Sequence, residues 1–363
     1  MKKKILIIDD SALMRRVLCD IINSDDRFEV TDIAHNGEEG LALIGSKSYD
    51  AVVMDMVMPK MDGITVLKKL QADRKRVRVL VFSSETTEGA NITMEALELG
   101  AIDFVHKPES IMGAHNEAFA KDFINRLSEV VASRIVTGSV PKLQSTPRAV
   151  QTAANAVGTP GRMTNAPRAA GGRKAIAIAA STGGPRALQS VIPFLPKEIQ
   201  APVLVVQHMP AGFTASLAER LNQQSQLHVV EAAEAMEVVA GTVYIAPGGK
   251  HMHVVEKRGG HFIHLTDGPH REGVKPSANF VYESLAECGY DSVVCVVMTG
   301  MGADGSEGIK NLKSVKPVYT ITQEQSTCAV YGMPKAAVTN GLSDEVEPLE
   351  NLASAITKQV GVK

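Results

Sequence analysis

Residues 4–134 alternate short apolar runs with longer amphipathic segments. Five apolar runs have the length and composition of buried strands: Ile5–Ile8, Val30–Ala34, Ala51–Met54, Val77–Phe82 and Ile102–Val105. The first intervening segment, Ser11–Asn23, has one apolar side, which consists of Leu13, Val17, Leu18, Ile21 and Ile22. A closing helix is expected at Phe119–Ile135. Strands that alternate with helices predict an α/β domain with a doubly wound parallel sheet.

The same alternation resumes at Lys174 and continues to the C-terminus. The stretch Ala175–Pro185, AIAIAASTGGP, is an apolar run that ends at Ser181. Two glycines then lead to a proline, which suits the first turn of a helix. This order predicts a buried strand, a tight turn and a helix start, with the serine at the carboxyl end of the strand. A second doubly wound α/β domain, with a Rossmann-like sheet, is therefore expected.

Two further apolar runs in this domain also end in polar residues. Pro202–Gln207 ends at His208, and Ser292–Thr299 leads into a glycine-rich turn that contains Asp304. Ligands of an open parallel sheet bind beyond the carboxyl ends of its strands, so Ser181, His208 and Asp304 are expected at one edge. A serine becomes nucleophilic when an imidazole takes its proton and a carboxylate orients that imidazole. The three residues favour a serine hydrolase, although their chain order is unfamiliar and no G-x-S-x-G elbow is present.

Two other functions of the second domain stay open at this point. Gly300–Gly305 has the form G-x-G-x-x-G, and Glu324 follows about 20 residues later near the end of the predicted strand Val318–Thr322, as in dinucleotide-binding folds. That function would leave Ser181 and His208 without a role and would put an aspartate where pyrophosphate should bind. A DNA-binding output is the other alternative, but the charges are mixed and no helix-turn-helix pattern is present.

Histidines flank a predicted turn at Arg258–Gly260 and raise the question of a metal site. Alternation along a strand puts His251 and His253 on one face, but His261 and His264 are three residues apart and face opposite ways. No cysteine or acidic ligand lies at a matching spacing. We therefore expect ordinary histidines of a hairpin.

Composition changes between the two domains. Residues 137–172 are rich in Pro, Ala, Thr and Gly, contain no acidic residue and lack apolar periodicity. Such a segment predicts a flexible linker of about 35 residues. Its basic residues could bind an acidic partner, but mainly they keep the linker solvated: Lys142, Arg148, Arg162 and Arg168. The predicted organisation is a domain at 1–136, a linker at 137–172 and a domain at 173–363.

The overall composition fits two globular domains. The 363 residues are 44% hydrophobic and 21% charged, and the net charge of −2 gives no basis for binding nucleic acid or a membrane surface. The four cysteines are scattered, which favours reduced thiols and a cytoplasmic location. The N-terminus, MKKKILIIDD, has too short an apolar run for a signal peptide, and no segment is long enough for membrane insertion.

Polar residues also gather at the strand ends of the first domain. Asp9 and Asp10 follow the first strand, Asp55 the third, Ser83 the fourth and Lys107 the fifth. Three carboxylates at one sheet edge form a hard oxygen site suited to Mg²⁺, which binds phosphate oxygens. The lysine could neutralise a phosphoryl group, and the serine hydroxyl could donate a hydrogen bond to it.

The motifs DDSALMRR, MDMVMPKMDG, FSS and HKP resemble those of the receiver domain of two-component response regulators. The resemblance implies a flavodoxin-like fold in which Asp55 is the phosphoacceptor and Asp9, Asp10 and Asp55 bind Mg²⁺. It also implies that Lys107 contacts the phosphoryl group and that Ser83 supplies the switch hydroxyl.

Phe104, three residues before Lys107, matches the aromatic switch position of the receiver family. Its ring has no hydroxyl for a hydrogen bond, and an ordinary core position would explain it equally well. Phosphorylation changes the local charge and can bias a two-state surface formed by the fourth strand and the helix after it. The first domain is therefore expected to control the second.

The blocks STGGP, QHMP, IAPGGKHM and TGMGADG resemble the catalytic domain of the chemotaxis protein-glutamate methylesterase (CheB) family. Together with the receiver motifs and the linker, this resemblance covers nearly the whole chain outside the linker. It implies that Ser181 is the nucleophile, that His208 is the general acid/base and that Asp304 orients the histidine. The oxyanion donors would be the backbone N–H groups of Thr182 and Met301.

The resemblance also implies a reaction and its control. Members of this family hydrolyse γ-glutamyl methyl esters on chemoreceptors and release methanol, and some also deamidate receptor glutamines. We expect the receiver domain to cover the serine until a sensor histidine kinase phosphorylates Asp55. Mg²⁺ would serve the phosphorylation, and ester hydrolysis would need no cofactor.

Overall fold

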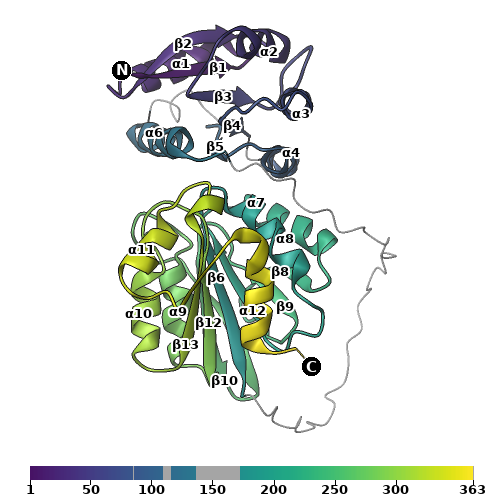
Figure 1. Cartoon of the computed structure of the whole chain (residues 1–363), viewed down its shortest axis with the longest axis vertical. Helices are drawn as coiled ribbons and strands as arrows, with labels where there is room; N and C mark the ends of the chain where they lie inside the picture. The colour runs from purple at the N-terminus through teal and green to yellow at the C-terminus, as the bar shows by residue number, and fades with distance from the viewer. Residues whose placement is uncertain (85, 109–115, 136–171, 363) are drawn as a thin grey trace.

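The computed structural model describes residues 1–84, 86–108, 116–135 and 172–362. They form two α/β domains, which lie one above the other in Figure 1. The predicted linker, residues 137–172, lies outside the described residues except for Gly172, so the predicted domain boundaries stay a prediction.

The N-terminal domain is a parallel sheet with helices on both faces. Its described elements are β1 (Lys3–Ile8), α1 (Ala12–Asn23), β2 (Phe28–Ala34), α2 (Gly37–Ser46), β3 (Ala51–Asp55), α3 (Gly63–Ala72), β4 (Val79–Ser83), α4 (Thr87–Glu98), β5 (Asp103–His106) and α6 (Glu117–Ala132). The strands lie in the order β2-β1-β3-β4-β5, and every neighbouring pair is parallel. This is the flavodoxin-like order that the receiver resemblance implies.

The predicted elements of this domain are present, with strand ends that shift by one or two residues. The fourth strand begins at Val79 rather than Val77, and the closing helix ends at Ala132 rather than Ile135 because Ser133 has an extended backbone. The predicted apolar side of α1 is wrong at one position, since Leu13 is 43% exposed and Met14 is buried instead. Successive side chains of a helix are roughly 100° apart, so either Leu13 or Met14 could lie at the edge of the buried face. Packing of α1 on the sheet buries Met14.

The C-terminal domain has a seven-stranded parallel sheet in the order β14-β13-β12-β6-β7-β9-β8. Its elements are β6 (Lys174–Ala180), α7 (Gly184–Gln189), η1 (Ile192–Phe194), β7 (Val203–Gln207), α8 (Phe213–Gln224), β8 (His228–Glu231), β9 (Thr242–Ile245), β10 (His251–Lys257), β11 (Gly260–Thr266), α9 (Ala278–Ala286), β12 (Ser292–Val297), α10 (Ser306–Lys313), β13 (Val318–Gln323), η2 (Gln325–Thr327), α11 (Met333–Thr339), β14 (Glu345–Glu347), η3 (Leu349–Asn351) and α12 (Leu352–Val360).

The helices of the C-terminal domain divide between the two faces of its sheet. Residues of α7, α8 and α12 join one buried cluster, and those of α9, α10 and α11 join another (Figure 1). Strands β10 and β11 form a separate antiparallel hairpin. Within the described part of the chain, no helix combines the length and the apolar character that crossing a bilayer requires.

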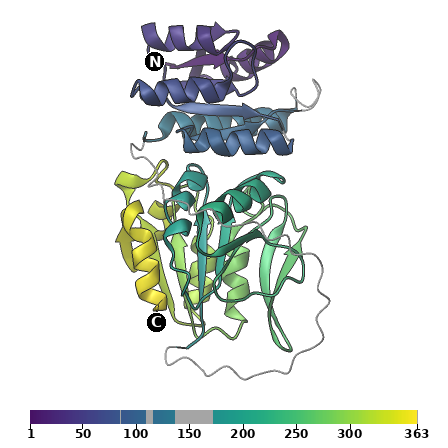
Figure 2. The ribbon, with the colours of Figure 1, turned by 90° about the vertical axis from the view of Figure 1, so that its right-hand side faces the viewer.

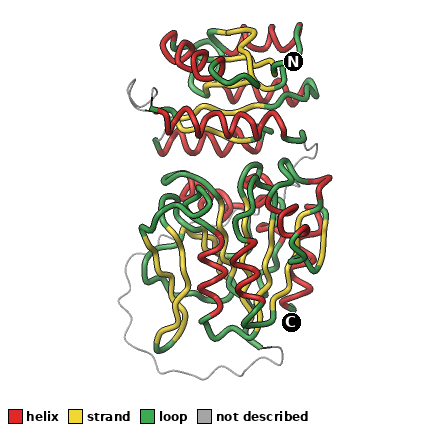
Figure 3. The backbone as a smooth tube through the Cα atoms, turned by 90° about the vertical axis from the view of Figure 1, so that its left-hand side faces the viewer, coloured by secondary structure: helices red, strands yellow, loops and turns green. Residues whose placement is uncertain are grey.

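The two domains contact each other through α4 of the first, which packs on α7 and α8 of the second, and through α6, whose Glu129 contacts Thr182. Figures 2 and 3 show the two stacked domains from opposite sides. Glu98 of α4 accepts hydrogen bonds from Arg220 Nε at 2.7 Å and from Gln224 Nε2 at 3.1 Å. After α6, the Arg134 N–H donates to the Ala329 carbonyl at 2.9 Å. Apolar residues of both domains belong to one buried cluster, so the domains pack directly on each other.

Candidate active site and acidic site

Ser181 and His208 follow two adjacent strand ends. Ala180 of β6 pairs with Gln207 of β7, so the next residue of each strand lies at the same edge of the sheet. The His208 N–H donates to the Ala180 carbonyl at 3.1 Å, and Gln207 Nε2 donates to the Ser181 carbonyl at 3.0 Å. The predicted placement of the serine and the histidine at one sheet edge is what the strand register requires.

Close packing explains the glycines around Ser181. Gly183 has a φ of 75°, which disfavours any residue with a side chain, and a Cβ on Gly184 would lie only 2.0 Å from Gln207 Oε1. A Cβ on Gly300 would lie 2.6 Å from the Cβ of Ser181. The first glycine of the G-x-G-x-x-G segment therefore allows the serine loop to approach, and dinucleotide binding is not needed to explain it.

His208 and Asp304 are in direct contact. His208 Nε2 lies 2.8 Å from Asp304 Oδ2, and both side chains are almost completely buried. A carboxylate accepts, so Nε2 carries the proton and donates it in this hydrogen bond. The neutral ring then has its lone pair on Nδ1, and this nitrogen is the one left to act as a base.

The Asp304 carboxylate is held by the N-terminal end of α9. Ser277 Oγ donates to Oδ1 at 2.6 Å, the Ala278 N–H donates to Oδ2 at 2.7 Å, and Asn279 Nδ2 donates to Oδ1 at 2.8 Å. Burial alone would raise the pKa of Asp304, but the hydrogen bonds from His208, Ser277 and the Ala278 N–H lower it below its usual value. The carboxylate therefore stays ionised beside the histidine, and the positive end of the helix dipole favours the same state.

The serine hydroxyl is not yet joined to this pair. Ser181 is half-buried, and among the described residues no hydrogen bond links its Oγ to His208. Catalytic hydrogen bonds are often long in a free enzyme and tighten when substrate binds. The structure thus joins two of the three predicted residues directly and places the third on the neighbouring strand end, and their catalytic roles stay a prediction.

The predicted oxyanion donors lie on the loops beside the serine. Thr182 is buried directly after it, whereas the Met301 side chain is half-exposed in the loop after β12. Within the described residues, neither backbone N–H donates a hydrogen bond, so both are available to an anion. Their role as oxyanion donors remains a prediction.

The N-terminal domain contacts the loop of Ser181. Thr182 Oγ1 donates to Asp103 Oδ2 of β5 at 3.1 Å and also contacts Glu129 Oε2 of α6. Burial, and then the nearby Asp103 charge, raise the pKa of Glu129 to about 7. The residue next to the candidate nucleophile is therefore part of the domain interface.

The acidic site of the N-terminal domain is assembled as predicted from strand ends. Asp9, Asp10 and Asp55 each offer a carboxylate oxygen, and these oxygens lie within 4.8 Å of one another. Lys107 Nζ lies 2.8 Å from Asp55 Oδ2 and 3.5 Å from Asp9 Oδ2. Asp10, Asp55, Ser83 and Lys107 all line a cavity of about 250 Å³ beside these groups.

The acidic site fits a divalent cation. Asp9 Oδ2 is buried and accepts no hydrogen bond, although the Lys107 ammonium lies 3.5 Å away. Burial raises the pKa of Asp9, and the Lys107 charge only partly offsets this, so a cation would stabilise the ionised form. Asp9, Asp10 and Asp55 provide the oxygen donors that Mg²⁺ prefers, and the receiver family suggests this ion.

The side chains of the two predicted switch residues contact groups outside the acidic cluster. Ser83 Oγ accepts a hydrogen bond from Thr93 Oγ1 at 2.6 Å and donates to the Gly89 carbonyl at 3.2 Å, so its hydroxyl is bound within α4. Phe104 is buried, and its ring packs against Phe213 of the C-terminal domain. Their switching roles stay a prediction.

The four histidines of the β10–β11 hairpin have ordinary cross-strand neighbours. His253 pairs with His264 across the hairpin, and His261 pairs with Glu256. In the part of the chain that the structure describes, Asp9, Asp10 and Asp55 form the one cluster with metal-ligand geometry.

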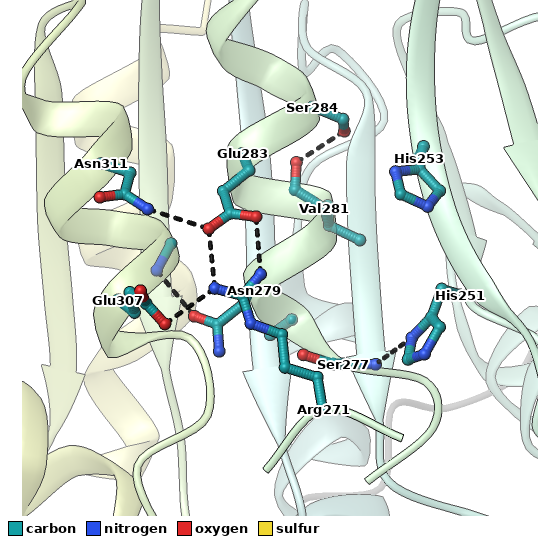
Figure 4. A network of polar contacts seen from close by, with 12 residues as sticks. His251, His253, Arg271, Ser277, Asn279, Val281, Glu283, Ser284, Glu307 and Asn311 are labelled. Carbon is teal, nitrogen blue, oxygen red and sulfur yellow. Dashed lines mark hydrogen bonds and ion pairs between the residues drawn. The ribbon is translucent and has the colours of Figure 1, made fainter. Parts of the chain in front are cut away.

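Sequence reasoning missed Ser277 and Asn279, which hold Asp304. Figure 4 shows Asn279 and Ser277 at the start of α9, with Arg271 and Glu283 beside them. Asn279 Oδ1 also accepts hydrogen bonds from the backbone N–H groups of Gly305 and Gly308. A serine before an apolar helical run is an N-cap signal that could have indicated the helix start, but it does not reveal the partner.

Known protein families match both domains. The CheB methylesterase family matches residues 176–356, and the response regulator receiver domain matches residues 5–116. The chain is 41% identical to the protein-glutamate methylesterase/protein-glutamine glutaminase 1 of Syntrophomonas wolfei, over 99% of this chain and 98% of that protein. It is 39% identical to the protein-glutamate methylesterase/protein-glutamine glutaminase of Bacillus subtilis, over 98% of each chain.

A solved structure supports the same relationship. The Thermotoga maritima CheB methylesterase catalytic domain is 40% identical, with a TM-score of 0.50, and the match covers 52% of this chain and 99% of that one. The predicted α/β fold class and both family resemblances are confirmed. The chain therefore belongs to the protein-glutamate methylesterase (CheB) family, with a response regulator receiver domain ahead of the esterase domain.

Proposed function

We propose that this protein hydrolyses γ-methyl esters of glutamate residues on chemoreceptors, releasing methanol, and that it also deamidates receptor glutamines. The proposal rests on relatives named for both activities over nearly their whole length. The observation that carries it is the buried His208–Asp304 pair at the strand end next to Ser181. We place the reaction in the cytoplasm, where the receptors present their substrate residues.

In the proposed mechanism, His208 Nδ1 takes the proton of Ser181 Oγ as that oxygen attacks the ester carbonyl. The tetrahedral oxyanion accepts hydrogen bonds from the Thr182 and Met301 N–H groups. The imidazolium, stabilised by Asp304, gives its proton to the departing methoxide, and methanol leaves an acyl-serine. Water, deprotonated by the same histidine, then releases the glutamate side chain and restores the serine. For a glutamine substrate the leaving group is ammonia.

We further propose that the receiver domain blocks this site until Asp55 is phosphorylated by a chemotaxis histidine kinase. The contacts of Thr182 with Asp103 and Glu129 support the proposal, because a segment of a chemoreceptor and the receiver domain cannot both occupy the space over Thr182. Mg²⁺ at Asp9, Asp10 and Asp55 would neutralise the charge of the incoming phosphoryl group. Ester hydrolysis itself uses only groups of the protein.

The test is methanol release from methylated chemoreceptor membranes, with and without Mg²⁺ and a small-molecule phosphodonor. Wild-type protein should release methanol, and the phosphodonor should stimulate that release. Ser181→Ala should reduce release to background while Asp55 still becomes phosphorylated. Absence of release by phosphorylated wild-type protein would overturn the proposal and point to another acyl substrate.

A further inference from the structure

His251 has no role in the proposed mechanism or in the acidic site. It contacts Ser277, one of the residues that hold the Asp304 carboxylate. It begins β10, is completely buried and packs on the ring of Phe280, with ring centroids 4.4 Å apart. Its Nε2 lies 2.9 Å from the Pro269 carbonyl oxygen, and its Nδ1 lies 3.2 Å from the Ser277 backbone nitrogen (Figure 4). Both ring nitrogens are therefore engaged by backbone.

These two contacts determine the state of the ring. A carbonyl oxygen can only accept, so Nε2 carries the proton, and the Ser277 N–H can only donate, so Nδ1 must be a lone pair. A protonated ring would place Nδ1–H against the Ser277 N–H. Burial lowers the pKa of His251, and the Lys275 charge acts in the same direction. The hydrogen bond to the Pro269 carbonyl and the Asp304 charge oppose this shift without reversing it.

The contact with Ser277 reaches the candidate catalytic pair in two further hydrogen bonds. Ser277 is completely buried, and a buried N–H without an acceptor costs about 1–3 kcal/mol. With its N–H held by His251, Ser277 directs Oγ to Asp304 Oδ1 at 2.6 Å, and Asp304 Oδ2 accepts from His208 at 2.8 Å. The chain of contacts runs from His251 through Ser277 and Asp304 to His208.

We infer that His251 is a positioning residue of the esterase site, whose neutral Nδ1 holds Ser277 so that Asp304 is correctly oriented toward His208. This inference rests on the proposed function, because it assigns His251 to the same Ser181 site. His251 touches no reacting atom, so its effect should be on the rate of the chemical step and not on binding.

The test uses the full chain with Mg²⁺ and a phosphodonor, and measures the rate at which a fluorophosphonate labels Ser181. This probe reports the reactivity of the serine whatever the natural ester is. His251→Asn keeps an acceptor near the Nδ1 position, whereas His251→Gln keeps a donor near the Nε2 position. We expect His251→Asn to retain labelling within about threefold, and His251→Gln to lower the maximal rate about tenfold or more, with the half-saturating probe concentration unchanged.

His253 provides a matched control, because it lies two residues along the same strand and packs on the same Phe280 ring, with centroids 5.2 Å apart. Its Nε2 contacts Thr266 Oγ1 instead of Ser277, so His253→Gln should label at the wild-type rate. Combining His251→Gln with Ser277→Ala should cost little more than the stronger single change, because both act through Asp304.

Several results would overturn the inference. A folded His251→Asn protein that labels at least about tenfold more slowly than wild type would show that the Nδ1 acceptor is not what matters. This comparison needs only wild type, so it stands even where His251→Gln fails to fold. Effects of His251→Gln and Ser277→Ala that simply multiply would do the same. If Ser181 of the wild-type protein is not labelled, the proposed catalytic site itself is overturned. If wild type is labelled and His251→Gln is labelled at the same rate, only the role of His251 is overturned.

Discussion

The Phe104 ring of the receiver domain packs against the Phe213 ring of the esterase domain, with centroids 4.4 Å apart and planes inclined by 32°. Both rings are buried. Phe104 occupies the position that the receiver resemblance implies for the aromatic switch, and Phe213 begins α8, the helix that also holds Glu98 through Arg220. A movement of Phe104 would therefore disturb the domain interface directly.

Replacement of Phe213 should loosen the interface. Loss of a buried aromatic ring from an interface costs about 1–2 kcal/mol, so Phe213→Ala should raise methanol release by the unphosphorylated chain roughly 5- to 30-fold. With phosphodonor and Mg²⁺, variant and wild type should release methanol at similar rates, which controls for damage to the esterase fold. Equal unphosphorylated rates would contradict a role of this contact in blocking the site.

The contact between the receiver and esterase domains should depend on pH, because it includes Glu129. Its pKa rises from an ordinary 4.5 to about 7 in the docked protein, because burial and the Asp103 charge disfavour its ionised form. Between pH 4.5 and about pH 7 the docked state binds more protons than the undocked state. Docking of the two domains is therefore strongest below pH 4.5 and weakens as the pH rises toward 7. Above pH 7 it no longer changes with pH. The ratio of unphosphorylated to phosphorylated methanol release should therefore increase between pH 4.5 and about pH 7.

Two variants check this pH dependence. Glu129→Gln cannot ionise, so its ratio should stay flat over the same range. Glu117 lies exposed in the first turn of α6 and does not contribute to the pKa shift of Glu129, so Glu117→Gln is the matched control and should keep the wild-type profile. A flat wild-type profile would be incompatible with a proton on Glu129 in the docked state.

We expect the acidic site to be required for stimulation of methanol release by the phosphodonor, but not for ester hydrolysis itself. Asp55→Asn removes the proposed phosphoacceptor and one of three carboxylates, so phosphodonor and Mg²⁺ should no longer stimulate methanol release. Its release should still exceed that of Ser181→Ala. Chelation of Mg²⁺ should likewise remove stimulation from wild type. An Asp55→Asn protein as inactive as Ser181→Ala would mean that the receiver does more than control access.

Asn279 should matter for both stability and activity. It donates to Asp304 Oδ1 and accepts from the Gly305 and Gly308 N–H groups, all within buried surroundings. Asn279→Ala should lower the free energy of unfolding by about 1–3 kcal/mol in urea titrations, and methanol release about tenfold. Asn311→Ala removes a surface asparagine that bonds to Glu283, and should change neither quantity appreciably.

Much of this arrangement could be predicted from local patterns. The alternation of apolar runs and amphipathic segments is a property of consecutive residues, and parallel strands place their carboxyl ends at one edge. That rule alone brings Ser181 next to His208 and gathers Asp9, Asp10 and Asp55. The error at Leu13 is of the expected kind, because a helical pattern does not determine the edge of the buried face.

The sequence by itself thus determined two α/β domains, the acidic site and the residues at the strand ends, since all of these follow from short-range periodicity and strand order. Only the tertiary structure decided what surrounds Asp304 and what covers Thr182. Ser277 and Asn279 reach Asp304, and His251 reaches Ser277, because α9 packs against α10 and β10. Glu129 reaches Thr182 across a domain interface. Such contacts depend on the packing of surfaces distant in the chain, which no local spacing encodes.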